Sequence, residues 1–161
     1  MRPSLSDYNT STPPHPHASC VDAPSADITV ACDTVVVSPD SLHILEKPRS
    51  RAECVQTLAM LNGATHSVVS GVVLTGPNGF RAEFTETTRV TFNTMPLSLI
   101  EAYADTDEPY DKAGGYGIQA TAASWVSGIE GDYFNVVGLP LCALCTRLRH
   151  MLTGTDTHAQ L

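Results

Sequence analysis

The sequence predicts one α/β or α+β domain in which helices pack on a single sheet. Strand-like β-branched segments are interspersed with segments of helical periodicity. Two capping-box patterns, Ser50-x-x-Glu53 and Ser98-x-x-Glu101, signal helix starts, and a Gly-Pro-Asn-Gly turn at residues 76–79 separates two strand-like segments. With 161 residues, 42% of them hydrophobic, the chain is long enough to bury a core.

Composition narrows the classes of function. The 17 acidic residues outnumber the 9 basic ones, and the resulting net charge of −8 argues against a broad nucleic-acid or anionic-membrane surface. No apolar run approaches the roughly 20 residues of a membrane span. Residues 1–26 contain no apolar core of a signal peptide, so we expect a cytosolic protein.

The five cysteines do not follow a disulfide framework, and we expect reduced thiols. Cys142-x-x-Cys145 has no second pair, and leucines at helical spacing surround it. We therefore predict that both thiols are buried in a helix as small apolar residues; a redox or metal role is the alternative.

Residues 1–26 are predicted to be a disordered tail, since they hold few large apolar side chains. Residues 28–37 form a β-branched run that Asp33 and Thr34 interrupt, which favours a strand buried on both faces. A carboxylate at such a place is costly unless it has a partner or a ligand. Asp33 is therefore either a structural cap or a catalytic or metal-binding carboxylate, and the residues alone leave both open.

The first capping box predicts a helix that buries Cys54, Leu58 and Leu61 and stops at Asn62-Gly63. Just before it come Lys47 and Arg49, where an anion is favoured. Residues 65–75 read as a strand in which His66 is a hydrogen-bonded histidine rather than a ligand. Residues 80–92 alternate as a hairpin partner with one wet face.

The second capping box predicts a short helix over 98–103, followed by an acidic loop over 105–109. Residues 123–127 read as a strand, and Pro140 suits the first residue of a closing helix over 141 to about 151. We therefore assign residues 27–152 to the domain and 153–161 to a tail.

The segment 111–119, which reads Asp-Lys-Ala-Gly-Gly-Tyr-Gly-Ile-Gln, carries the densest chemistry. Its glycines would let backbone N–H groups approach an anion. Other charged groups also stand at element ends; the full set is Asp33, Glu46, Lys47, Asp111, Lys112, Glu130 and Asp132. Carboxylates with lysines suggest a phosphate chain bridged by a divalent cation, although no Walker-type loop occurs.

Five segments occur in the order and at about the spacing of the Maf family of nucleoside triphosphate pyrophosphatases. They are residues 31–36 (Ala-Cys-Asp-Thr-Val-Val), 45–48 (Leu-Glu-Lys-Pro), 63–66 (Gly-Ala-Thr-His), 111–119, and 129–140 (Ile-Glu-Gly-Asp-Tyr-Phe-Asn-Val-Val-Gly-Leu-Pro). The chain resembles that family from about residue 26 to residue 147, and its last two segments are long and specific.

The resemblance implies an inosine-triphosphate-pyrophosphatase-like α/β fold, with a central mixed, twisted sheet flanked by helices. It implies cleavage of a nucleoside triphosphate, preferably dTTP or UTP, to the monophosphate and pyrophosphate with Mg²⁺ or Mn²⁺. By motif, Asp33 resembles the proton acceptor, and Thr34 a neighbour that affects specificity. Lys47 and Lys112 resemble phosphate contacts, and Gln119 the residue that reads the base. The resemblance also implies a homodimer.

One segment departs from the family pattern. Maf proteins normally begin with a strand that leads into a Ser-x-Ser-x-Arg-Arg loop, whereas residues 4–7 read Ser-Leu-Ser-Asp and nothing before Asp33 matches. This leaves two expectations: a divergent start, or a chain that lacks part of its phosphate clamp. The alternative function is accordingly a catalytically impaired nucleotide-binding or interaction module.

Overall fold

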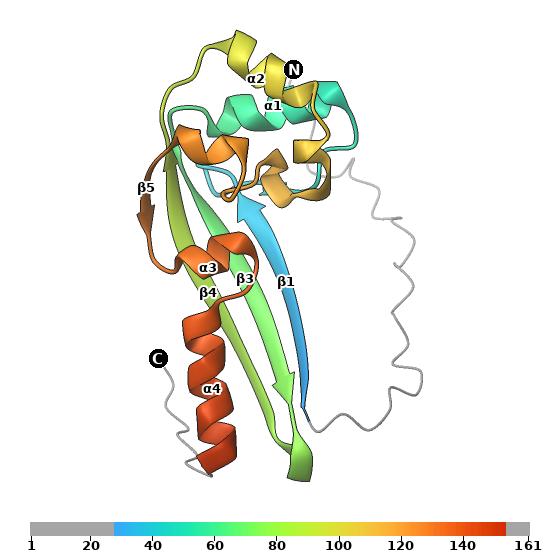
Figure 1. Cartoon of the computed structure of the whole chain (residues 1–161), viewed down its shortest axis with the longest axis vertical. Coiled ribbons are helices and arrows are strands. Elements are labelled where there is room, and N and C mark those ends of the chain that lie inside the picture. Colours follow the sequence, from blue (N-terminus) through green and yellow to red (C-terminus); the bar gives the residue numbers. More distant parts are fainter. Residues whose placement is uncertain (1–27, 154–161) are drawn as a thin grey trace, which may run out of the picture.

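The computed structural model describes residues 28–153, and the two predicted tails lie outside this range apart from Thr153. Five strands form one sheet in the order β2-β1-β3-β4-β5 (Figure 1). The strands are β1 (Thr29–Val37), β2 (Ile44–Leu45), β3 (Thr65–Thr75), β4 (Arg81–Phe92) and β5 (Val126–Glu130).

Helices pack against this sheet, which confirms the predicted α/β class. The α-helices are α1 (Arg51–Leu61), α2 (Leu97–Ala104), α3 (Tyr133–Val137) and α4 (Leu141–Thr153). Short 3₁₀ segments are η1 (Pro77–Gly79), η2 (Glu108–Asp111), η3 (Ala113–Gly115) and η4 (Thr121–Trp125). All pairings among the described strands are antiparallel, so the mixed sheet that the resemblance implied has no parallel pair within residues 28–153.

Two apolar clusters hold the helices to the sheet. In the larger cluster, α1 and α2 pack at one end of the sheet, around Phe92, Tyr103 and Trp125. In the smaller cluster, Leu144 of α4 packs on Val72 of β3, at the far half of the β3–β4 hairpin. Figure 1 shows this division: α1 and α2 lie above the sheet, and α3 and α4 lie along it.

The expected burial of β1 on both faces is wrong. Residues 29–33 are exposed, although each pairs with β3 across a continuous antiparallel register. Along this part of β1, only one edge has a strand partner within residues 28–153, because β2 pairs with Val36 and Val37 alone. The β-branched run thus predicted the strand correctly but overestimated how much of the strand is buried.

Several local predictions are confirmed. The Ser50 hydroxyl caps α1 by accepting from the Glu53 N–H at 3.2 Å, and Cys54, Leu58 and Leu61 are buried on one face. The β3–β4 hairpin also forms at residues 65–92, with an exposed face. These features depend on contacts between residues close in sequence, which is why the pattern reveals them.

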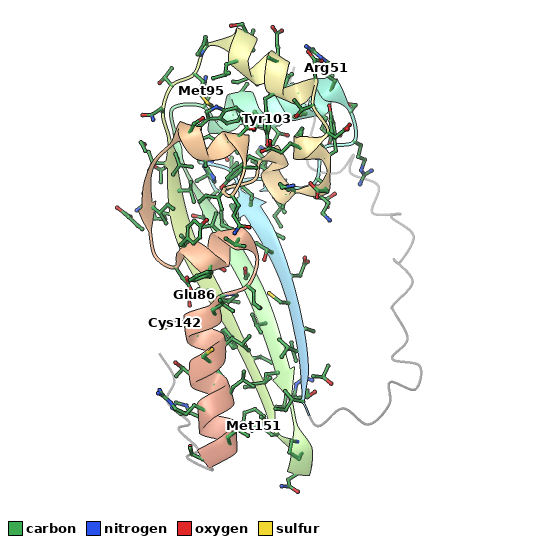
Figure 2. The ribbon with its side chains drawn as sticks, viewed as in Figure 1. Arg51, Glu86, Met95, Tyr103, Cys142 and Met151 are labelled. Atoms are coloured by element: carbon green, nitrogen blue, oxygen red, sulfur yellow. The ribbon has the colours of Figure 1, made fainter. Side chains whose placement is uncertain are left out.

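Three other local predictions are wrong in whole or in part. Helix α2 begins at Leu97 after Pro96, and Ser98 does not cap it. The strand predicted over 123–127 exists as β5 but begins only at Val126, because residues 123–125 form part of η4. Cys142 and Cys145 are exposed, since the apolar face of α4 is made by its leucines. Figure 2 labels Cys142 on this helix. No helix within residues 28–153 combines the length and the apolar character that crossing a bilayer requires.

Candidate functional site

A cavity of about 320 Å³ lies where β1 and β3 meet the loop that follows η2. Its lining comes from five separate parts of the chain. They are residues 32–34 with Val36, Lys47, Val68, residues 111–113 with 116–120, and residues 136–138. All five predicted site residues line this one cavity: Asp33, Thr34, Lys47, Lys112 and Gln119.

The floor of the cavity follows from strand alternation. Cys32, Thr34 and Val36 share one face of β1, and the register pairs Thr34 with Ser70 and Val36 with Val68. The Thr34 and Ser70 hydroxyl oxygens lie 2.7 Å apart. Because Ser70 is completely buried, this contact fixes the direction of the Thr34 hydroxyl.

Helix α3 and the residues after it form one wall. The Asn135 side-chain amide, which is fully buried, donates to the Val68 carbonyl at 3.0 Å and to the Thr88 hydroxyl at 3.1 Å. The Gly138 carbonyl accepts from Thr34 Oγ1 at 3.3 Å and from Cys32 Sγ at 3.4 Å. The wall is therefore attached to both central strands through hydrogen bonds.

Asp33 lines the cavity from the exposed part of β1. Its Oδ1 accepts a hydrogen bond from the Thr34 backbone N–H at 3.0 Å. Because Asp33 is exposed, its carboxylate does not carry the free-energy cost of burial that was expected from the sequence. An exposed carboxylate with one oxygen held by the backbone can accept a proton from a water molecule on the cavity side.

Lys112 brings positive charge to the opposite wall. Its ammonium group donates to Asp111 Oδ1 at 2.5 Å and to the Glu108 carbonyl at 3.2 Å. This hydrogen bond from Lys112 lowers the pKa of the Asp111 carboxyl. The Lys112 side chain also lies against Gly117, where a Cβ would be 2.7 Å from Lys112 Cε. Gly117 therefore leaves room for the lysine.

The segment before α1 is held against the same loop. The Gly114 N–H donates to the Glu46 carbonyl at 3.2 Å, and a Cβ on Gly115 would be 3.3 Å from Pro48 Cγ. These contacts place Lys47 beside the cavity. They also use up backbone donors: the Gly115 N–H bonds to the Lys112 carbonyl at 3.0 Å. The expectation that Gly114 and Gly115 offer N–H groups to an anion is therefore wrong.

Three of the charged residues that the sequence grouped together do not line the cavity. Glu46 pairs with Arg49 at 3.4 Å, and Glu130 pairs with Arg89 at 3.6 Å. Asp132 caps α3 by accepting from the Phe134 N–H at 2.8 Å. Each of these charges therefore has a partner within the protein at the end of an element.

The described residues contain no cluster of three metal-ligating side chains. Asp33 and Asp111 are the carboxylates that line the cavity. Mg²⁺ typically takes one or two carboxylates and completes its shell with phosphate oxygens and water. The donor set is therefore compatible with a divalent cation that enters together with a phosphorylated ligand.

Sequence reasoning missed several residues at this site. Val68 and Ser70 belong to a strand for which only a scaffold role was expected. Val136 and Val137 come from a segment in which only Glu130 and Asp132 were considered as site residues. Period-two alternation would have put Val68 and Ser70 on one face. The pairing of that face with Thr34 depends on the strand register.

His66 is the hydrogen-bonded strand histidine that was predicted, and its partner is Tyr116. Its Nε2 lies 2.8 Å from the Tyr116 hydroxyl oxygen. His66 is 2% exposed, and burial lowers its pKa from 6.5 to about 4. The imidazole is therefore neutral at pH 7.

This burial predicts acid destabilisation. As pH falls below 6.5, the unfolded chain binds a proton at His66 that the folded chain does not bind until about pH 4. Between pH 7.5 and pH 4, His66 should cost the wild type about 3 kcal/mol of unfolding free energy. Urea unfolding at both pH values measures the free energy of unfolding of the wild type and of His66→Gln, whose amide does not titrate. Between the two pH values the wild type should lose about 3 kcal/mol more than His66→Gln. Equal losses in the two proteins would contradict it.

Comparison with known proteins places the chain in a family. The Maf-like protein family model matches residues 14–151. A dTTP/UTP pyrophosphatase of Koribacter versatilis is 49% identical over 123 residues, which cover 76% of this chain and 62% of the relative. The corresponding protein of Exiguobacterium sibiricum is 47% identical over 127 residues, covering 78% of this chain and 63% of the relative.

A third relative gives the same picture. The dTTP/UTP pyrophosphatase of Geobacillus sp. is 50% identical over 112 residues, covering 70% of this chain and 59% of the relative. The chain thus spans about three fifths of the length of these curated relatives. Since the family model matches well over half of the chain, the protein belongs to the Maf family.

Proposed function

We propose that this chain hydrolyses nucleoside triphosphates with a uracil or thymine base to the monophosphate and pyrophosphate. The observation that carries the proposal is that Asp33, Lys47, Lys112 and Gln119 line one and the same cavity. These residues are distant in sequence, and together they offer a proton acceptor, two cations and an amide. The three relatives described above, at 47–50% identity, are named dTTP/UTP pyrophosphatases.

In this mechanism, Asp33 orients a water molecule and accepts its proton as the water oxygen attacks the α-phosphorus. The bond between the α-phosphorus and the bridging oxygen breaks, and pyrophosphate leaves with that oxygen. Lys47 and Lys112 bind the charged phosphate oxygens and stabilise the negative charge of the leaving group. General-base catalysis of this kind contributes roughly 10²–10⁴-fold to rate.

Asp33 and Asp111 are the groups that would hold a divalent cation, Mg²⁺ or Mn²⁺, together with the phosphates. When bound, the cation supplies charge neutralisation on the phosphate oxygens. Asp111 already lies against Lys112, so a phosphate chain that enters the cavity meets a lysine and a carboxylate side by side.

Gln119 is assigned to the base. A side-chain amide offers one donor and one acceptor side, which suits the O4 and N3–H edge of uracil or thymine. The apolar side chains of Val68, Ile118 and Val136 line the same cavity. They suit the flat face of a pyrimidine ring. Thr34, with its direction set by Ser70, is the neighbour proposed to affect specificity.

The proposal is tested by pyrophosphate release from UTP, dTTP and 7-methyl-GTP with Mg²⁺ or Mn²⁺. UTP and dTTP should give the higher kcat/KM values, and removal of the cation with EDTA should abolish turnover. Equal rates on all three nucleotides would contradict the role of Gln119. Binding of UTP without release of pyrophosphate would support the alternative, a nucleotide-binding module without catalysis.

The proposal extends to assembly and compartment. We propose a homodimer that acts in the cytosol on free nucleotides rather than on nucleic acid or membranes. Light scattering on the purified chain would test the dimer. A mass that stays at one chain across the working concentration range would contradict it.

A further inference from the structure

His66 is a buried polar group that the proposed reaction does not use. It lies on β3 opposite Val90, in contact with two other rings. Its ring meets Phe92 edge to face at 5.0 Å and Tyr116 edge to face at 5.4 Å. Phe92 and Tyr116 also meet edge to face, at 4.8 Å. The three rings therefore restrict one another beneath the cavity.

Tyr116 connects this cluster to the cavity. It is 5% exposed and lines the cavity, and its hydroxyl group lies 2.8 Å from His66 Nε2. The chain continues from Tyr116 into a turn that is closed by the Ala120 N–H, which donates to the Gly117 carbonyl at 3.2 Å. Gln119 lies within that turn. The position of the Tyr116 ring in the core therefore sets where the turn that contains Gln119 begins.

The hydrogen bond between His66 and Tyr116 is not an effective way to stabilise the fold. A neutral imidazole carries one N–H, and His66 Nδ1 is buried without a hydrogen-bond partner among the described residues. An apolar pair of similar volume would fill the same space without leaving a buried polar atom unpaired. What the hydrogen bond adds is direction, because it holds the Tyr116 ring at one position along the floor of the cavity.

We infer that His66 is a positioning residue for base recognition: through Tyr116 it holds the turn that carries Gln119, and so contributes to the preference for a pyrimidine base. The inference rests on the proposed function, since it assigns Gln119 to the base. It concerns the base more than the phosphates, because the Lys112 ammonium is held by Asp111 and the backbone of the segment that carries Lys47 is held by the Gly114 N–H. It predicts that loss of the hydrogen bond weakens nucleotide binding and spares inorganic triphosphate.

The test compares the full chain with Tyr116→Phe, which keeps the ring and removes the hydroxyl. Calorimetry would measure binding of α,β-imido-dUTP, which resists hydrolysis, and of inorganic triphosphate. Tyr116→Phe should weaken binding of the nucleotide about five- to ten-fold, the size of one net hydrogen bond. Binding of inorganic triphosphate should stay within about two-fold. His66→Leu should give the same pattern, and the double variant should be no weaker than either single one.

Two further variants separate positioning from stability. His66→Gln keeps a hydrogen-bonding group and should restore part of the nucleotide affinity that His66→Leu loses. Leu74→Ala opens a cavity in the other apolar cluster of the same strand, because Leu74 is fully buried there. It should lower the melting temperature and leave the ratio of the two affinities unchanged.

Each contrary outcome has a distinct meaning. Equal losses for nucleotide and inorganic triphosphate, or no loss for either, would overturn the positioning role while nucleotide binding by the wild type still supports the proposed function. A wild-type chain that binds inorganic triphosphate as tightly as the nucleotide would overturn the assignment of Gln119, and the role of His66 with it.

Discussion

Replacing Asp33 with asparagine is expected to lower kcat for UTP by roughly 10²–10⁴-fold, which is the usual contribution of a general base. The substitution is nearly isosteric, and asparagine Oδ1 can still accept from the Thr34 N–H as Asp33 does at 3.0 Å. The local structure should therefore persist while the proton acceptor is lost. KM should rise as well, because Asp33 is one of the two carboxylates proposed to hold the divalent cation that binds the phosphates. Steady-state pyrophosphate release measures both constants.

Asp107→Asn is the matched control for this experiment. It makes the same chemical change at an exposed carboxylate that does not line the cavity, and it should leave kcat within about two-fold. If Asp33→Asn turns over UTP at the wild-type rate, the proton acceptor is another group. If both variants are equally slow, the loss comes from net charge and not from Asp33.

The second large effect is expected from Gly114→Ala, which should lower the free energy of unfolding by roughly 2–5 kcal/mol. Gly114 has a φ of 70°, a conformation that costs an alanine about 1–2 kcal/mol. A Cβ there would also stand 2.9 Å from Val36 Cγ2. Val36 is in the core and is 3% exposed, so it has little freedom to move away.

Gly79→Ala separates the two causes. Gly79 has a similar φ of 75°, but a Cβ there would meet no heavy atom within 4 Å. Gly79→Ala should therefore lower the free energy of unfolding only by the cost of the backbone conformation, about 1–2 kcal/mol. The difference between the two variants in urea unfolding should be about 1–3 kcal/mol, the usual cost of overpacking. Equal losses would show that Val36 yields to the added methyl group.

Gly114→Ala should also disturb function. Gly114 follows Lys112 by two residues, and its N–H is bound to the Glu46 carbonyl. A displacement of this loop moves Lys112 and the segment that carries Lys47 together. This coupling explains why a residue whose own N–H is not available to a ligand still matters for the cavity.

Much of the fold was predictable because its signals are local. The capping of α1 by Ser50 and the buried face of Leu58 and Leu61 depend on spacing within one helix. The β3–β4 hairpin depends on alternation and a short turn. The prediction failed at Ser98, because the helix begins at Leu97 and places Ser98 inside its first turn rather than at the N-cap. It also failed at Cys142, whose neighbours on α4 provide enough apolar surface without it.

For the candidate site, the sequence and the tertiary structure determined different things. By itself the sequence determined which chemical groups are present: family-like motifs singled out Asp33, Lys112 and Gln119, and a hydrogen-bonded strand histidine was expected at His66. Only the tertiary structure decided which of these groups meet. It brings Asp33 and Lys112 to one cavity, whereas Glu130 forms an ion pair with Arg89 away from that cavity.

The physical reason is that a side chain's partners across a sheet depend on register, and register depends on the whole set of strand and helix contacts. The pairing of Thr34 with Ser70, the bond from Asn135 to Val68, and the contact of His66 with Tyr116 span 36, 67 and 50 residues of sequence. No local pattern reaches that far. Composition and spacing supply the groups, and the packed chain decides which of them act together.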